Sequence, residues 1–231
     1  MKSQAKPTSQ DWKADVLSKV DPVRTALLVI DLQRDFCSDD GALAALGSDV
    51  SPCKTVANRI ADFLPDARGQ VAFVAFFKLI YEIDEMSEAQ RERLLRDGKP
   101  VICGPASSGS ELCITPARED LIFEKHRYSA FTNEHFRQLL KDCAISTVAV
   151  AGVDTHICVE GTVRHGYDLG YRMLVLSDLV ATRRAEFNRH ENSLALCERY
   201  FALTLDSGAF LELLRTRPAL SSESTATKRE R

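Results

Sequence analysis

Residues 147–171, TVAVAGVDTHICVEGTVRHGYDLGY, carry the pattern on which the predicted fold depends. An apolar run over 147–151 leads into a short glycine-led turn, and a helical pattern that includes Cys158 follows. A helix N-terminus exposes unpaired backbone N–H groups and a partial positive charge. We therefore expect a lowered pKa for the Cys158 thiol and hydrogen-bond donors for an oxyanion forming beside its sulfur. A lone helical cysteine is more often a small buried apolar residue, so a catalytic role for Cys158 requires partners.

Two charged residues at the ends of other apolar runs are candidate partners of Cys158. Asp31 follows the run over 25–30, and Lys125 follows the short run over 121–124. Taken singly, an aspartate at such a place is commonly a turn residue or a helix cap, and a lysine is commonly solvated. In open parallel sheets, however, ligands bind outside the carboxyl ends of the strands. Asp31, Lys125 and Cys158 are therefore predicted to converge in one cleft as a catalytic set.

Short β-rich runs alternate with helical patterns along the rest of the chain. The apolar runs are mostly continuous, which is typical of strands buried on both faces. They cover residues 25–30, 70–77, 121–123, 147–151 and 171–176, and helical patterns cover 53–63, 85–96, 133–141, 157–169, 188–201 and 207–214. The alternation predicts an α/β fold with a mostly parallel, doubly wound sheet in a three-layer αβα arrangement. We expect an N-terminal extension over 1–22, one domain over 23–216, and a disordered tail over 217–231.

The composition predicts one globular domain located in the cytoplasm. The chain has 231 residues, 45% of them hydrophobic, and a formal net charge of -3, with no long basic stripe for binding nucleic acid or an anionic membrane. No apolar run approaches the roughly 20 residues that span a bilayer, and the first residues lack the apolar core of a secretion signal. The seven cysteines are scattered without a CxxC pair, which favours reduced thiols over a disulfide framework or a zinc site.

Four segments together resemble one enzyme family. They are ALLVIDLQRDF at 26–36, FEKHRYSAF at 123–131, AGVDTHICVEGTVRHGYDLGYRMLVLSD at 151–178 and RHENSLALCERYFA at 189–202. In this order they resemble the isochorismatase-like cysteine hydrolases, which include nicotinamidases, N-carbamoylsarcosine amidohydrolases, ureidoacrylate amidohydrolases and biuret hydrolases. The resemblance implies a Rossmann-like sheet of about six parallel strands. It also implies assembly into a homodimer or a homotetramer.

The resemblance assigns roles to residues of this chain. It implies a catalytic set of Asp31, Lys125 and Cys158. It also implies a cis peptide bond between Val153 and Asp154, and an oxyanion hole formed by the backbone N–H groups of Asp154 and Cys158. Asp31 would take the thiol proton, Lys125 would hold the carboxylate, and the sulfur would attack an amide carbonyl to give a thioester. Hydrolysis of the thioester would complete the reaction.

The sequence around the nucleophile indicates the ureide branch of the family. Glu160 follows the Cys-Val pair, as it does in ureidoacrylate and biuret hydrolases, so we expect a small amide or ureide as substrate. Gln33 would offer a hydrogen-bonding amide, and Phe36, Tyr128 and Phe131 would form apolar walls around a planar substrate. Core packing near the sheet edge is the alternative role of the aromatic rings.

Two departures from the family pattern leave alternatives open. Nicotinamidases place a metal-binding Asp-x-His roughly twenty residues after the catalytic aspartate, and this chain has no histidine there. We therefore expect no metal and no other cofactor, with a nicotinamidase-like hydrolase as an alternative. Asp154 stands where the family usually has a small or apolar residue, and its carboxylate opposes an oxyanion unless it points away or meets a cation. A non-catalytic binding or assembly protein on the same fold is the second alternative.

Overall fold

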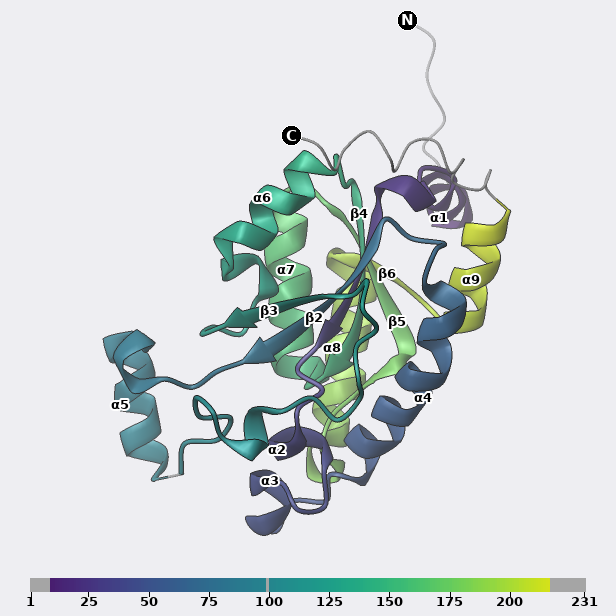
Figure 1. Ribbon diagram of the computed structural model, residues 1–231. Coiled ribbons are helices and arrows are strands. Elements are labelled where there is room, and N and C mark those ends of the chain that lie inside the picture. Colours follow the sequence, from purple (N-terminus) through teal and green to yellow (C-terminus); the bar gives the residue numbers. More distant parts are fainter. Residues whose placement is uncertain (1–8, 99, 217–231) are drawn as a thin grey trace, which may run out of the picture.

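A parallel sheet forms the centre of the protein in the computed structural model, which describes residues 9–98 and 100–216 (Figure 1). Within these residues the sheet has six strands in the order β3-β2-β1-β4-β5-β6, and all neighbouring strands run parallel. The strands are β1 (Thr25–Ile30), β2 (Phe73–Leu79), β3 (Leu121–Lys125), β4 (Thr147–Val153), β5 (Arg172–Ala181) and β6 (Ala202–Leu205). The strand order reverses between β1 and β4, which makes this the topological switch point. The predicted doubly wound α/β fold is confirmed.

Helices cover both faces of the sheet. In Figure 1, α4 (Ser51–Ala67) and α9 (Ser207–Arg215) lie on one face, and α6 (Glu134–Asp142), α7 (Glu160–Asp168) and α8 (Phe187–Tyr200) lie on the other. The remaining α-helices of the described residues are α1 (Ser9–Ser18), α2 (Arg34–Cys37), α3 (Ala42–Ala45) and α5 (Glu88–Asp97). Because both faces are covered, every residue of β1 and β4 is buried. This burial explains why the central strands have continuous apolar sequences.

The observed strands differ from the predicted runs mainly at their ends. β5 continues to Ala181 instead of stopping at residue 176, although Asp178 lies within it. The Asp178 carboxylate accepts hydrogen bonds from the backbone N–H and the hydroxyl of Ser207, at 2.8 and 2.7 Å. The start of α9 therefore satisfies a polar side chain inside β5, which runs past Leu176, where the predicted run ends.

The ends of the chain add two elements that the sequence pattern does not predict. The predicted extension over 1–22 contains α1, and β6 is a strand of four residues, most of them only partly buried. The predicted tail over 217–231 lies outside the described residues. Across the described ranges, no helix is both long enough and apolar enough to cross a membrane.

The carboxyl ends of β1 and β4 approach each other closely at Gly152. This residue pairs with Ile30 in the sheet register, and its φ of 119° lies in the region that favours glycine. A Cβ atom added here would lie 2.1 Å from the carbonyl oxygen of Ile30. Glycine therefore permits the approach that brings the residues after β1 next to the residues after β4.

Candidate active site

Side chains from three strand ends meet at the topological switch point. Asp31 follows β1, Lys125 is the last residue of β3, and Cys158 lies in the turn after β4. Lys125 Nζ donates a hydrogen bond to Asp31 Oδ2 at 2.7 Å, and both side chains are almost completely buried. Cys158 is also buried, and its thiol interacts with both partners. The three residues that the strand-end argument selects are therefore neighbours in the structure.

Backbone hydrogen bonds fix Asp31 in an uncommon conformation. Its φ of 52° lies in the left-handed region, and its N–H donates to the carbonyl of Phe77 at 3.0 Å. The N–H of Gln33 donates to the carbonyl of Asp31 at 2.7 Å. In the described part of the protein, carboxylate oxygen Oδ1 has no hydrogen-bond partner of normal geometry. That oxygen is available to accept the proton of the Cys158 thiol, with which the Asp31 carboxylate interacts.

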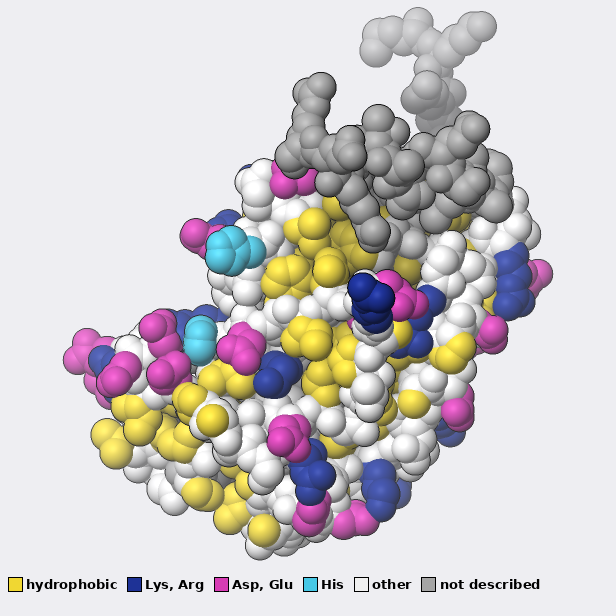
Figure 2. All heavy atoms as spheres, viewed as in Figure 1, with side chains coloured by type: hydrophobic (Ala, Val, Ile, Leu, Met, Phe, Trp, Pro, Cys, Tyr) yellow, Lys and Arg dark blue, Asp and Glu magenta, His cyan; other side chains and the backbone are white. Residues whose placement is uncertain are grey.

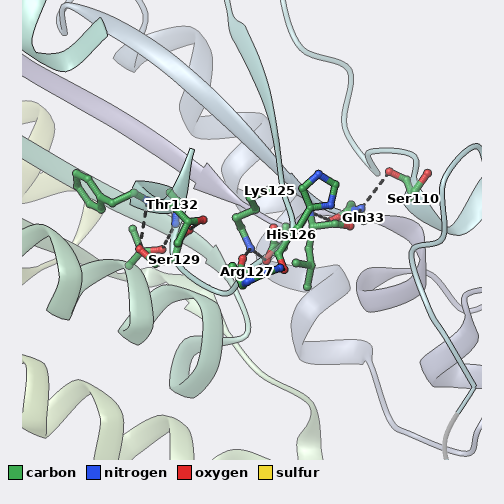
Figure 3. A network of polar contacts seen from close by, with 12 residues as sticks. Gln33, Ser110, Lys125, His126, Arg127, Ser129 and Thr132 are labelled. Carbon is green, nitrogen blue, oxygen red and sulfur yellow. Dashed lines mark hydrogen bonds and ion pairs between the residues drawn. The ribbon is translucent and has the colours of Figure 1, made fainter. Parts of the chain in front are cut away.

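Lys125 reaches Asp31 across β2, since β2 lies between β3 and β1 in the sheet. Its ammonium group also donates a hydrogen bond to the carbonyl of Arg127 at 3.2 Å. Figure 3 shows Lys125 in the middle of a polar network, with Ser129 on one side and Gln33 on the other. Two acceptors, the Asp31 carboxylate and the Arg127 carbonyl, therefore hold the ammonium in place.

A tight turn between β4 and α7 presents Cys158. The peptide bond between Val153 and Asp154 is cis, as the family resemblance implies. The N–H groups of Ile157 and Val159 both donate to the carbonyl of Asp154, at 3.1 and 3.2 Å. Cys158 lies between these two donors, in a π-helical turn that precedes the regular helix α7. The turn holds the thiol close to the end of β4.

Burial controls the protonation of this cluster. It raises the pKa of the Cys158 thiol well above its ordinary value, and the negative charge of Asp31 adds to the rise. The prediction of a lowered thiol pKa is wrong, because the sulfur is enclosed by protein and faces a carboxylate. Burial also raises the pKa of Asp31, although the Lys125 ammonium opposes this rise. Burial disfavours the charged form of Lys125, but Asp31 and Cys158 outweigh it and raise the Lys125 pKa.

The raised pKa of Asp31 predicts an acid limb in the pH dependence of turnover. The predicted role of Asp31 as the base requires its ionised carboxylate, so kcat/KM is expected to fall about tenfold per pH unit below that pKa. Because the pKa is raised, the midpoint is expected above the ordinary aspartate value of 3.8. A pH–rate profile measured down to about pH 4 locates the midpoint. A profile that stays flat over this range would contradict the role of Asp31 as the base.

A cavity of about 200 Å³ opens beside Cys158. Its wall includes Phe36 and Tyr128, two of the predicted substrate-binding residues, together with Asp154 and Arg183. Much of the remaining wall is apolar, so a few polar groups determine how a ligand lies in it. The cavity therefore has room for one small molecule.

Two predicted substrate contacts, those of Gln33 and Phe131, need correction. The Gln33 amide is buried and bonds to backbone groups: Nε2 donates to the carbonyls of Leu79 and Ser110 at 2.9 and 3.2 Å, and Oε1 accepts from Leu79 N–H at 2.8 Å. Phe131 is fully buried and stacks on Tyr171 with ring centroids 5.4 Å apart. Neither side chain lines the cavity, because both are already used to hold the strand ends and the core together.

Arg183 is a residue of the cavity wall that the sequence analysis missed. Its Nε lies 3.6 Å from Asp154 Oδ2, and Asp154 is only 7% exposed. The unexpected carboxylate therefore meets a cation of the protein, which removes the main motive for a non-catalytic interpretation. Arg183 comes shortly after β5 ends at Ala181, so the strand-end argument would have selected it if the predicted strand had been long enough.

The histidines near the site make hydrogen bonds within the protein. His165 Nδ1 lies 3.0 Å from the hydroxyl of Ser129, and His190 Nδ1 lies 2.8 Å from the hydroxyl of Thr155. Over residues 9–98 and 100–216, no three His, Cys, Asp or Glu side chains are grouped so that they could hold a metal ion.

The chain matches known proteins over most of its length. Residues 25–208 match the family model described as the isochorismatase domain. The ureidoacrylate amidohydrolase RutB of Methylorubrum extorquens is 30% identical over 202 residues, which cover 80% of this chain and 81% of that protein. A solved cysteine hydrolase from Pseudomonas syringae pv. phaseolicola has a TM-score of 0.73 and 21% identity, covering 85% of this chain and 95% of the other. An N-carbamoylsarcosine amidase from Thermoplasma acidophilum has a TM-score of 0.63 and 24% identity, with 80% and 96% covered. Because the family model spans most of the chain, this protein belongs to the isochorismatase-like cysteine hydrolase family.

Proposed function

We propose that this protein is a metal-independent amidohydrolase that cleaves a C–N bond of a small amide or ureide through a Cys158 thioester. The observation that carries the proposal is the buried pair of Asp31 and Lys125, 2.7 Å apart, beside a thiol that lines a small cavity. A carboxylate, an ammonium and a thiol in contact supply a base, a positioning cation and a nucleophile. The cavity supplies room for one small substrate.

The named relatives support the same class of reaction. The chain is a hydrolase acting on carbon–nitrogen bonds other than peptide bonds, in agreement with the amidohydrolase and amidase names of its relatives. Ureidoacrylate, biuret and N-carbamoyl compounds share a ureido group, and we propose this group as the reacting part of the substrate. The cytoplasmic location and the homodimer or homotetramer are further parts of this proposal.

The first half of the reaction forms the thioester. Asp31 takes the thiol proton while Cys158 Sγ forms a bond to the substrate carbonyl carbon, and the carbonyl electron pair moves onto oxygen. We propose that the backbone N–H groups of Asp154 and Cys158 stabilise this oxyanion. When the carbonyl re-forms, the C–N bond breaks, and Asp31 gives its proton to the leaving nitrogen. Ammonia or an amine departs, and Lys125 again faces an ionised carboxylate.

The second half hydrolyses the thioester. Asp31 takes a proton from a water molecule while the water oxygen bonds to the thioester carbonyl carbon. Collapse of the second oxyanion breaks the C–S bond and releases the acid product. The departing Cys158 thiolate takes the proton back from Asp31, which restores the neutral thiol and the ion pair with Lys125. The same carboxylate therefore acts as base and acid in both halves.

A substrate screen with and without a chelator tests this proposal. Biuret, ureidoacrylate, N-carbamoylglycine and nicotinamide are incubated separately with the purified protein, and ammonia release is measured. We expect release from at least one of the ureides at a rate that the chelator does not change. Loss of activity with chelator would contradict the metal-independent mechanism, and turnover of nicotinamide alone would favour the nicotinamidase-like alternative. Failure to turn over any ureide or amide would reject the proposed function.

A further inference from the structure

The charged side chains that line the cavity occur as pairs of opposite charge. Arg183 Nε lies 3.6 Å from Asp154 Oδ2, which we call the inner pair, and Arg93 Nε lies 3.6 Å from Asp97 Oδ2, which we call the outer pair. Asp97 also binds the exposed Arg96, at 2.9 Å. Among the described residues of the wall, each arginine therefore already faces a carboxylate.

The inner pair differs from the outer pair in its burial. The Asp154 and Arg183 side chains are 7% and 19% exposed, whereas those of Asp97 and Arg93 are 29% and 57% exposed. The outer pair lies on α5, and Figure 2 shows that acidic, basic and hydrophobic side chains share this face of the molecule. Water and salt screen exposed charges more strongly than buried ones. The inner pair therefore interacts more strongly with a charged ligand next to Cys158.

We propose that the pair of Asp154 and Arg183 makes this site select uncharged amides or ureides over substrates that carry a carboxylate. The proposal rests on the proposed function and narrows its substrate class. An unpaired arginine in such a wall would attract a carboxylate, since a guanidinium matches its geometry. Here Asp154 compensates the positive charge and also repels an anion brought next to it. A ureido acid such as ureidoacrylate carries the disfavoured charge.

A neutral ureide fits the same pair through hydrogen bonds. Its N–H groups are donors for a carboxylate, and its carbonyl oxygens are acceptors for a guanidinium. Arg183 Nε is buried without a hydrogen-bond partner in the part of the chain that the structure describes, and its distance of 3.6 Å from Asp154 is too long for a hydrogen bond. Buried donors without partners are uncommon, and Arg183, which borders the cavity, therefore has hydrogen-bonding capacity that the protein itself leaves unused.

A matched pair of substrates tests the selection. N-carbamoylglycine carries a carboxylate, and its N-methylamide replaces that group with a neutral amide of similar size. Both present the same ureido group, whose cleavage releases ammonia. For the wild-type protein, kcat/KM is expected to be at least about tenfold higher for the neutral compound. If neither compound is hydrolysed, their inhibition constants against the ureide found in the screen are expected to show the same order.

Two substitutions test the residues. Asp154→Asn keeps the shape of the side chain but leaves Arg183 uncompensated, so the anionic-to-neutral ratio of kcat/KM is expected to rise by about tenfold or more. Arg183→Gln leaves the Asp154 charge uncompensated, so the anionic-to-neutral ratio of kcat/KM is expected to fall below the wild-type value. The control is Asp120→Asn, which removes the carboxylate of another buried pair, 2.6 Å from Arg68 and outside the cavity wall. This variant is expected to keep the wild-type ratio.

The outcomes separate this inference from the proposed function. If the wild-type protein hydrolyses ureides with equal kcat/KM for the anionic and the neutral compound, the inference is overturned but the proposed amidohydrolase function is not. An anionic-to-neutral ratio of kcat/KM that Asp154→Asn leaves unchanged also overturns the inference. If circular dichroism shows that Asp154→Asn does not fold, the ratio measured for Arg183→Gln decides instead. A protein that hydrolyses no amide or ureide loses the proposed function, and the inference with it.

Discussion

Replacement of Cys158 by serine is expected to reduce ammonia release by at least about 10⁴-fold while the protein stays folded. The serine hydroxyl has nearly the same shape as the thiol, but it holds its proton far more tightly. The Asp31 carboxylate can receive a proton from a thiol whose pKa is raised by burial, but an alkoxide formed next to a negative charge is much less accessible. The loss should therefore appear in kcat, since the substitution leaves the cavity wall almost unchanged.

Cys197→Ser is the matched control for this variant. Cys197 lies in α8 and is 2% exposed, compared with 4% for Cys158, and it does not line the cavity. Both variants place a hydroxyl where a buried thiol was, so both test the tolerance of the fold for that change. We expect Cys197→Ser to keep most of the activity, and both variants to unfold within about 4 °C of the wild-type protein. Turnover that survives in Cys158→Ser would show that another group carries the reaction.

The strand-end argument works for Asp31, Lys125 and Cys158 because parallel topology alone determines where those positions lie. The carboxyl ends of all parallel strands meet at one edge, and long side chains there can reach each other even across a strand, as Lys125 does across β2. The same argument misses Arg183 because the length of β5 depends on a tertiary contact. Asp178 lies within the strand with its carboxylate bound to Ser207, which is far away in the sequence.

The roles of Gln33 and Cys158 depend on surroundings that the sequence pattern does not contain. Gln33 lies two residues after Asp31 in the sequence, but its amide donates to the carbonyls of Leu79 and Ser110 and so links two strand ends and a loop. For the Cys158 thiol, a helix N-terminus and burial act on the pKa in opposite directions. A motif shows the first effect, whereas the second depends on how completely the finished fold encloses the sulfur.

The ion pair of Asp31 and Lys125 is expected to control both stability and catalysis. The side chains are 1% and 0% exposed, so Lys125→Met leaves a carboxylate in the core without its cation. Removing one partner of a buried pair typically costs about 3 to 5 kcal/mol, whereas replacing both is often close to neutral. We therefore expect Asp31→Asn and Lys125→Met each to lower the free energy of unfolding by about 3 kcal/mol, and the double variant to recover most of that loss. Urea unfolding of the four proteins measures the coupling.

Activity and pH distinguish a catalytic pair from a purely structural one. All three variants are expected to lose at least about 10³-fold in kcat/KM, including the double variant whose stability is recovered, because the base or its positioning cation is missing. Without Lys125, the pKa of Asp31 rises further above its unfolded value, since the cation that opposed the effect of burial is gone. A group with a raised folded-state pKa stabilises the protein at low pH and loses that contribution as the pH rises through the folded pKa. Lys125→Met should therefore approach wild-type stability as the pH falls. If the stability losses of the two single variants simply add in the double variant, the two charges do not act as a pair.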